Sequence, residues 1–224
     1  MKRLFELINR NFENTFLLHS GQYKHNTLPI ITISRERGSG GRPISYLVAK
    51  KLGNPWQVYH KDIVDEIANE TSLDPELIKQ LDESKGSVIQ ELLNTIFGKK
   101  MLTMNAYYKH LLHILASIGS KGYAIIIGRG ANFLFPNALK VRIVSDMQFR
   151  EQSMIKYEHI SLKEARKQIA DSDKERNEFS ISLFQHDQRK AHHYDVVIRT
   201  SGHINVEEAA DVIVYLAKKK FNLK

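Results

Sequence analysis

The stretch "IITISRERGSGGRPIS", residues 30–45, decides how the rest of the sequence is interpreted. It begins with β-branched apolar residues, passes through three glycines in four positions and continues into a segment with helical spacing. A glycine-rich turn between a strand and a helix lets backbone N–H groups converge on an anion, and the helix N-terminus adds positive potential. The stretch therefore predicts a phosphate-binding loop, with a plain tight turn as the alternative.

The loop departs from the Walker pattern at both of its ends. Arg35 or Ser34 stands where the first glycine belongs, and Gly41 stands where the lysine belongs, with Arg42 one place later. The hydroxyl that would face a magnesium ion is also displaced, and the nearest candidates are those of Ser39 and Ser45. If the loop binds phosphate, the sequence predicts that Arg42 stands in for the missing lysine.

Strand-like and helix-like segments alternate along the chain. Short apolar or β-branched runs, bounded by glycine, proline or polar residues, predict strands at 29–34, 56–60, 123–128, 139–145 and 194–200. Segments with helical spacing lie between them. This alternation is typical of a parallel α/β sheet with helices on both faces, which binds its ligands at the carboxyl ends of the strands.

The sequence predicts one α/β domain over residues 28–224 with two helical excursions, at about 61–120 and about 147–192. Residues 1–27 are expected to form a helical arm whose apolar stripe packs on the core or on a second subunit, so a homodimer through this arm is one possibility. The chain contains no repeat and no low-complexity linker.

Composition and charge narrow the class of protein further. There is no cysteine, which excludes disulfides and thiolate metal sites. The formal net charge is +8, but the lysines are scattered, so charge alone does not indicate a nucleic-acid partner. No apolar run approaches the roughly 20 residues of a membrane span, and the N-terminus is no secretory h-region. We therefore expect a soluble, cytoplasmic protein without a membrane partner.

Four segments in a fixed order resemble the cytidylate kinase-like family, a branch of the nucleoside monophosphate kinases. They are "ITISRERGSGGRPIS", "VYHKDIVDEIA", "AIIIGRGANFLF" and the closing "DSDKERNEF" with "HYDVVIRTSG" and "VEEAADVI". The resemblance spans residues 29–216. It implies a three-layer P-loop kinase fold, with a five-stranded parallel sheet flanked by helices, a helical acceptor-binding insertion and a lid. The insertion would be the excursion at 61–120, and the lid would be that at 147–192.

The resemblance also implies a donor site and a lid. The donor triphosphate would be held by Gly38, Ser39, Gly40, Gly41 and Arg42. Asp173 and Arg176 fall where the lid presents charged groups to the transferring phosphoryl group. Their spacing of three residues also suits a simple ion pair within one helix. Arg150 and Arg189 are further candidates for the same cationic ring.

On the acceptor side, the resemblance implies roles for Asp62, Arg129 and Gly130. Arg129 would hold the acceptor phosphate, although a surface arginine after a strand is the alternative. Asp62 follows the second strand, where the acceptor nucleoside binds, and it suits a helix N-cap equally well. Gly130 stands where true cytidylate kinases carry the aspartate that contacts cytosine, which leaves the acceptor open.

Taken together, these features predict a phosphotransferase that uses ATP and Mg²⁺, both implied by the resemblance, and acts on a CMP-like or related small acceptor. The alternative is a catalytically weak or inactive nucleotide-binding regulatory protein of the same fold, because the Walker lysine is missing. No protein-borne metal site is expected, since the histidines lack any metal-binding spacing.

Overall fold

The apolar run before the glycine-rich loop forms the central strand of a sheet. In the computed structural model, which describes residues 28–60 and 106–223, β1 spans Ile30–Arg35. All its side chains from Ile30 to Ser34 are buried. A strand buried on both faces is typical of a parallel sheet covered by helices. The glycine-rich loop therefore begins at the carboxyl end of a buried central strand.

Five parallel strands form the sheet of the described residues, in the order β2-β3-β1-β4-β5. The other four strands are β2 (Gln57–Tyr59), β3 (Ala124–Ile127), β4 (Leu139–Ser145) and β5 (Val196–Thr200). β1 pairs with both β3 and β4, with Ile33 opposite Ile127 on one side and opposite Val141 on the other. The five predicted strands are confirmed, and so is the parallel α/β class.

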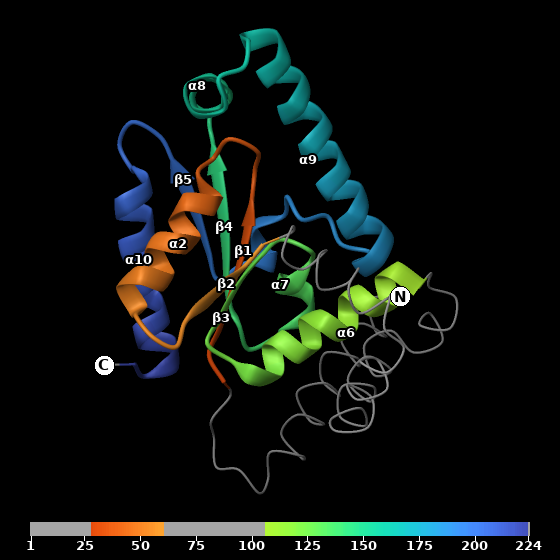
Figure 1. Ribbon diagram of the computed structural model, residues 1–224, viewed down its shortest axis with the longest axis vertical. Coiled ribbons are helices and arrows are strands. Elements are labelled where there is room, and N and C mark those ends of the chain that lie inside the picture. Colours follow the sequence, from red (N-terminus) through yellow and green to blue (C-terminus); the bar gives the residue numbers. More distant parts are fainter. Residues whose placement is uncertain (1–27, 61–105, 224) are drawn as a thin grey trace, which may run out of the picture. The chain divides into compact units, whose positions relative to one another are not determined.

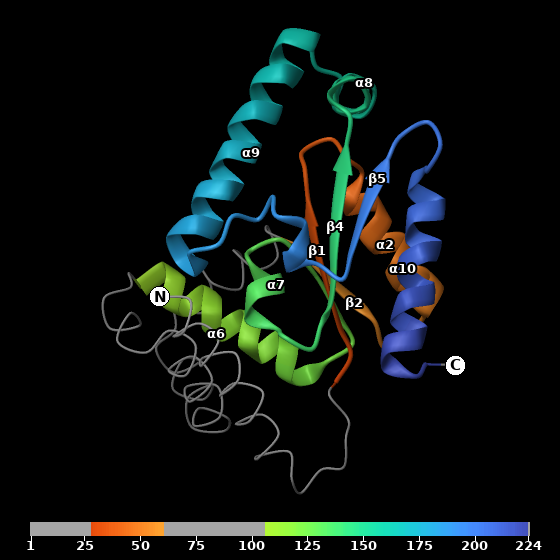
Figure 2. The ribbon, with the colours of Figure 1, turned by 180° about the vertical axis from the view of Figure 1, so that it is seen from behind.

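One face of the sheet is covered by α2 (Gly41–Leu52) and α10 (Val206–Phe221), which lie side by side (Figures 1 and 2). Ile44 and Val48, four residues apart, point from α2 into the main core. α10 contributes small side chains that include Ala209 and Ala210. This packing fixes the first turn of α2, and with it the glycine-rich loop, against the sheet. A short helix, α7 (Ala131–Leu134), contacts β1.

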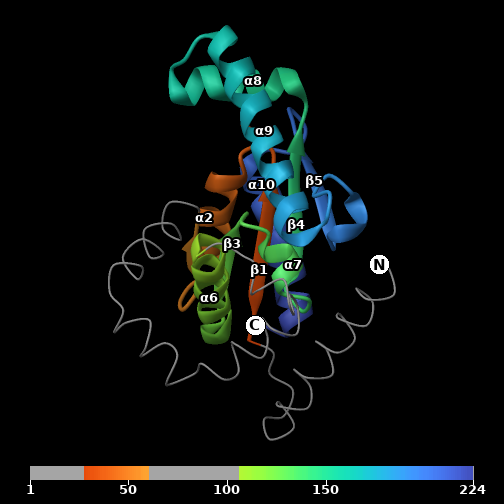
Figure 3. The same cartoon turned by 90° about the vertical axis from the view of Figure 1, so that its right-hand side faces the viewer.

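Two further helices form a hairpin beyond the carboxyl end of β4 (Figure 3). They are α8 (Met147–Glu158) and α9 (Leu162–Phe184), which fall within the excursion at 147–192 and which we call the lid hairpin, although the lid role itself stays a prediction. Met154, Ala165 and Ile169 form a small core of their own between them. A 3-10 turn, η2 (Ala191–His193), leads from this region into β5. The hairpin is thus a distinct packing element at the carboxyl end of the sheet, where sheets of this type bind their ligands.

The chain divides into two compact units. Residues 29–60 and 123–223 belong to the unit that contains the sheet, and α6 (Ala106–Lys121) belongs to the other. The predicted N-terminal arm, Asp62 and most of the predicted acceptor insertion lie outside the described residues. Within the described ranges, none of the helices has the length and apolar character needed to cross a bilayer.

Candidate functional site

The loop between β1 and α2 has the backbone geometry of an anion cradle. Gly38 and Gly40 adopt left-handed φ angles of 79° and 81°. The turn is closed by Ser39, whose amide and hydroxyl both donate to the Glu36 carbonyl, at 3.4 and 2.9 Å. Within the described part of the chain, the amides of Gly38, Gly40 and Gly41 donate to no protein acceptor. Backbone N–H groups that have no protein acceptor at the start of a 12-residue helix are suited to bind phosphate oxygens.

Glycine is required at position 38 because α8 passes directly over the loop. A Cβ atom built on Gly38 would lie 2.8 Å from the carbonyl oxygen of Arg150. Contacts this short with a backbone atom cannot be relieved by a side-chain rotation. The loop is therefore held between the sheet and the first turn of the lid hairpin.

Arg150 joins the loop to the lid. This side chain is buried, and its Nε donates to the Arg37 carbonyl at 2.6 Å. Its Nη2 also donates to Asp173 on α9, and its Nη1 lies 3.7 Å from Glu36. Glu36 additionally lies 3.8 Å from the buried Arg142 of β4. One carboxylate of the loop thus faces two buried guanidinium groups.

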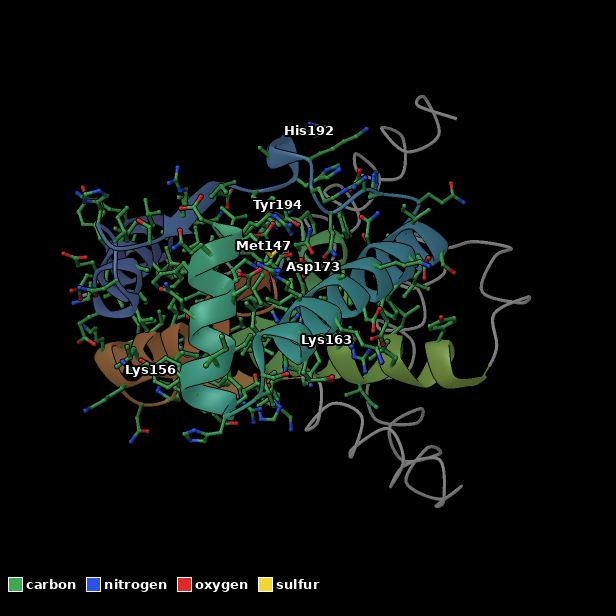
Figure 4. The ribbon with its side chains drawn as sticks, turned by 90° about the horizontal axis from the view of Figure 1, so that it is seen from above. Met147, Lys156, Lys163, Asp173, His192 and Tyr194 are labelled. Carbon is green, nitrogen blue, oxygen red and sulfur yellow. The ribbon has the colours of Figure 1, made fainter. Side chains whose placement is uncertain are left out.

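Both predicted lid residues contact the loop. Asp173 accepts a hydrogen bond from the Arg37 amide at 3.1 Å, and Arg176 donates to the Arg35 carbonyl at 3.0 Å. Figure 4 shows Asp173 on the part of α9 that lies beside the start of α8. Among the described residues, the ion-pair partner of Asp173 is Arg150, so the simple pair with Arg176 within the helix is not formed.

Among the described residues around the loop, arginines outnumber carboxylates. Burial lowers the pKa of the Arg176 guanidinium, Asp173 partly offsets this, and the nearby Arg37 and Arg150 lower the pKa further. Arg37 also pairs with Glu158 at 2.6 Å. Among the described residues, five guanidinium groups face three carboxylates around the loop. The arginines are Arg35, Arg37, Arg142, Arg150 and Arg176, and the carboxylates are Glu36, Glu158 and Asp173. An anionic ligand would balance this excess.

Arg129 and Gly130 follow β3 at the same end of the sheet. Both have left-handed backbone angles, with φ of 54° and 69°. The Arg129 guanidinium lies 5.6 Å from the ring centre of Phe179 on α9. A Cβ atom on Gly130 would lie 1.9 Å from Phe184. The predicted acceptor arginine is therefore near the lid helix, and the position beside it has no room for a side chain.

Two other arginines that the sequence suggested for the site, Arg42 and Arg189, have exposed side chains. Arg42 is exposed in the first turn of α2, with its Nη2 3.2 Å from Nε2 of His60. Arg189 is exposed and is held by the Asp187 carboxylate at 2.8–3.2 Å. This contact lowers the pKa of Asp187 to about 2.

The residues present fit a triphosphate better than they fit a magnesium ion. Unused amides and excess guanidinium charge are the groups that bind phosphate. In contrast, the Ser39 hydroxyl lies against the Glu36 and Ile143 carbonyls, and the Ser45 hydroxyl donates to the Arg42 carbonyl at 2.6 Å. The described residues contain no cluster of three or more His, Asp or Glu side chains that could hold a metal. Any Mg²⁺ would thus be held mainly by phosphate oxygens and water.

Two arginines have a larger place in the site than the sequence pattern indicates. Arg150, by sequence a secondary candidate, is buried against the loop, and Arg35, which stands in place of a glycine, lies against Gly41 and Gly128. The sequence does contain a signal for Arg35, because the loop has an arginine in place of the first Walker glycine and a glycine in place of the lysine. Burial of Arg150 has no local sequence signal, because it depends on contacts with residues more than 100 positions away.

A parallel sheet with a glycine-rich loop at the end of its central strand, lined by arginines from a helical hairpin, is the arrangement of a kinase-like α/β protein of the P-loop type. The chain belongs to the cytidylate kinase-like family, whose model matches residues 30–202. This membership makes it a kinase-like nucleotide-binding protein. No curated protein sequence matches the chain significantly.

Solved structures resemble this chain at low sequence identity. An uncharacterized protein from Eubacterium ventriosum aligns with a TM-score of 0.58 and 21% identity. TT1252 from Thermus thermophilus gives 0.47 and 12%, and dephospho-CoA kinase from Campylobacter jejuni gives 0.39 and 13%. Each alignment covers 85% of this chain and 98% of the other. The first of these likenesses supports the fold.

Proposed function

We propose that this protein transfers the γ-phosphoryl group of ATP to a nucleoside monophosphate or a related small acceptor. The observation that carries the proposal is the loop at residues 36–41, whose glycine amides have no protein acceptor among the described residues while guanidinium groups from the loop and the lid surround it. Phosphoryl transfer needs little covalent chemistry from a protein. It depends on alignment of donor and acceptor and on positive charge around the transferring group.

Each element of the site would have its own part in the reaction. The amides of Gly38, Gly40 and Gly41 would bind the donor phosphates, for which ATP supplies the transferable group. Arg176, held over the loop by α9, would stabilise charge on the phosphoryl oxygens as it redistributes. Arg129 would hold the acceptor phosphate. Asp173 and Arg150 would fix the lid helices against the loop, which orients Arg176.

A nucleotide-binding protein with little or no turnover is the second candidate function. The specific observation in its favour is that Asp173 already accepts the Arg37 amide hydrogen in the loop. A carboxylate at this position repels phosphate. The position of the Walker lysine also carries no cation of its own, because it is Gly41.

A coupled ADP-release assay with ATP, Mg²⁺ and CMP, dCMP, UMP or AMP would test the proposal, with nucleotide binding measured in parallel by calorimetry. We expect acceptor-dependent ADP release that Arg176→Ala lowers by about 10²–10³-fold, comparable to the loss of one aimed donor. Arg166→Ala is the matched control, since Arg166 lies on the same helix with its side chain 63% exposed. Tight ATP binding without ADP release for any acceptor would favour the second candidate.

A further inference from the structure

Arg35 follows an unusual course through the site. A Cβ atom built on Gly41 would lie 2.7 Å from Cβ of Arg35, 2.9 Å from its Cγ and 3.7 Å from its Cδ. A Cβ atom on Gly128, which follows β3, would lie 2.2 Å from Nη1 of Arg35. The side chain therefore leaves the end of β1, passes over Gly41 and places its guanidinium beside Gly128.

This course explains why position 41 is glycine, and it adds a close contact at position 128, where the left-handed backbone already favours glycine. Gly41 does not adopt a left-handed φ and stands at the first position of α2, so its backbone conformation does not call for glycine. The Arg35 stem alone excludes a side chain there. Gly128, with φ of 76°, would meet the guanidinium itself. The arginine and the two glycines thus form one steric unit.

We propose that Arg35 supplies the donor-phosphate cation that a lysine at position 41 would otherwise supply. The two departures from the Walker pattern then compensate for each other. Arg35 replaces the first glycine and brings in a cation, and Gly41 replaces the lysine and makes room for the arginine side chain. The cation comes from the end of β1 and crosses the space that the lysine side chain would fill. The inference rests on the proposed phosphate site and names the residue that neutralises the ligand there.

The placement of the charge favours Arg35 over Arg42, which the sequence alone had suggested. The Arg35 guanidinium lies between the glycine-rich loop and the loop that carries Arg129, at the carboxyl ends of β1 and β3. A group there can contact the terminal phosphate of a donor. Arg42 instead extends from the exposed side of the first turn of α2 toward His60.

The test measures binding of inorganic triphosphate and of ATP by calorimetry, without an acceptor. We expect Arg35→Gln and Arg35→Gly to weaken triphosphate binding by about 10- to 100-fold, as for loss of a charge-assisted contact. Arg42→Ala should weaken it by less than about threefold, because that charge faces away from the loop. Arg166→Ala, an exposed arginine of the lid, is the control for net charge.

A double-mutant cycle makes the inference specific. Gly41→Lys alone should weaken binding and lower Tm, because its Cβ would collide with the Arg35 stem. Arg35→Gly combined with Gly41→Lys should recover binding to within about fivefold of wild type, since the space is cleared and a cation returns to it. Gly41→Ala should likewise lower Tm in the wild-type protein, but it should not lower Tm in the Arg35→Gly variant.

The outcomes separate the two proposals. If Arg35→Gln binds triphosphate as tightly as the wild type, Arg35 does not have the proposed role, although the phosphate site stands. The same conclusion follows if Arg42→Ala, and not Arg35→Gln, abolishes binding. If the double variant Arg35→Gly/Gly41→Lys loses as much triphosphate affinity as the two single variants together, the two positions do not compensate for each other. If wild-type protein binds neither triphosphate nor ATP, the proposed function and this inference both fall. The Tm cycle with Gly41→Ala still reports on the steric unit in that case.

Discussion

At the scale of single residues, the site is shaped by glycines whose missing side chains make room for larger neighbours. Gly38 admits the backbone of α8, Gly41 and Gly128 admit Arg35, and Gly130 admits the ring of Phe184. In each case the neighbour comes from another element. The glycines therefore act as contact points between elements, in addition to providing backbone freedom at the three that have left-handed angles.

Substitution of Gly130 separates these two roles. Gly130→Ala should lower the free energy of unfolding by about 2–4 kcal/mol, because it adds backbone strain and displaces Phe184. Gly53→Ala is the control for backbone strain without a collision, since Gly53 has φ of 74° and ψ of −170°, a region open essentially to glycine, and open space around its Cβ position. There we expect only the backbone cost of about 1–3 kcal/mol. Urea denaturation measures both losses, and a loss at position 130 of only about 1–2 kcal/mol, the left-handed backbone cost alone, would show that Phe184 adapts freely.

The same glycine bears on the choice of acceptor. No side chain fits at position 130, so no carboxylate can read an amino-pyrimidine from there. We expect kcat/KM for CMP and UMP to differ by less than about tenfold, whereas a site built to hydrogen-bond the base discriminates by about 10⁴-fold or more. Steady-state kinetics with both acceptors would measure this ratio. A preference of the larger order would mean that another residue reads the base.

At the scale of secondary-structure elements, the lid hairpin is attached to the loop by a small polar network. Asp173 on α9 accepts from the Arg37 amide and pairs with Arg150 of α8, while Arg150 donates to the Arg37 carbonyl. The hairpin has its own small apolar core. Its position over the loop thus depends largely on charged groups, which an anionic ligand can rearrange.

Neutralising Asp173 tests this dependence. Asp173→Asn keeps an acceptor but removes the charge that faces Arg150, so the free energy of unfolding should fall by about 2 kcal/mol. Added inorganic triphosphate should then raise Tm more than it does in wild type, because the ligand replaces the lost negative charge. Glu178→Gln, an exposed change on the same helix, should show neither effect. Equal Tm shifts in Asp173→Asn and wild type would argue that the network and the ligand do not compete.

At the scale of the whole molecule, a histidine cluster is expected to make folding stability depend on pH. The ring of His193 lies 4.9 Å from His186 and 5.1 Å from Phe133, and its buried Nε2 has no hydrogen-bond partner among the residues that the structure describes. Burial is the main cause that lowers the pKa of His193 from 6.5 to about 4. The positive charges of the nearby His186, His192 and Lys190 lower the pKa further, and Asp187 partly offsets these effects. The cluster joins the segment after α9 to the turn before β5.

Between these two pKa values the unfolded chain binds the proton that folded His193 does not. The free energy of unfolding should therefore fall as pH is lowered from about 6.5 toward 4, with the loss complete below 4. His193→Gln should flatten this part of the stability curve, while His203→Gln, at an exposed position, should not. Denaturant titrations at several pH values measure the slope. An unchanged slope in His193→Gln would assign the acid sensitivity to other groups.

Much of this architecture could be predicted from local patterns in the sequence. Runs of β-branched residues located all five strands, and the glycine-rich stretch located the turn before α2. The predicted helix after the loop is confirmed, although α2 begins at Gly41, before Pro43, which is tolerated in a first helical turn. These features could be predicted because strand and helix periodicity and turn chemistry act over a few neighbouring residues.

The arrangement of charges around the loop was decided only by the tertiary structure. Arg37 and Asp173 are separated by 136 positions in the chain, and Arg37 and Arg150 by 113. No local pattern shows which arginine will be buried or which carboxylate it will face, since both depend on how the strands and lid helices pack. The sequence alone determined that a cation is missing at position 41. Only the fold, by bringing Arg35 across Gly41 toward Gly128, placed another cation in that space.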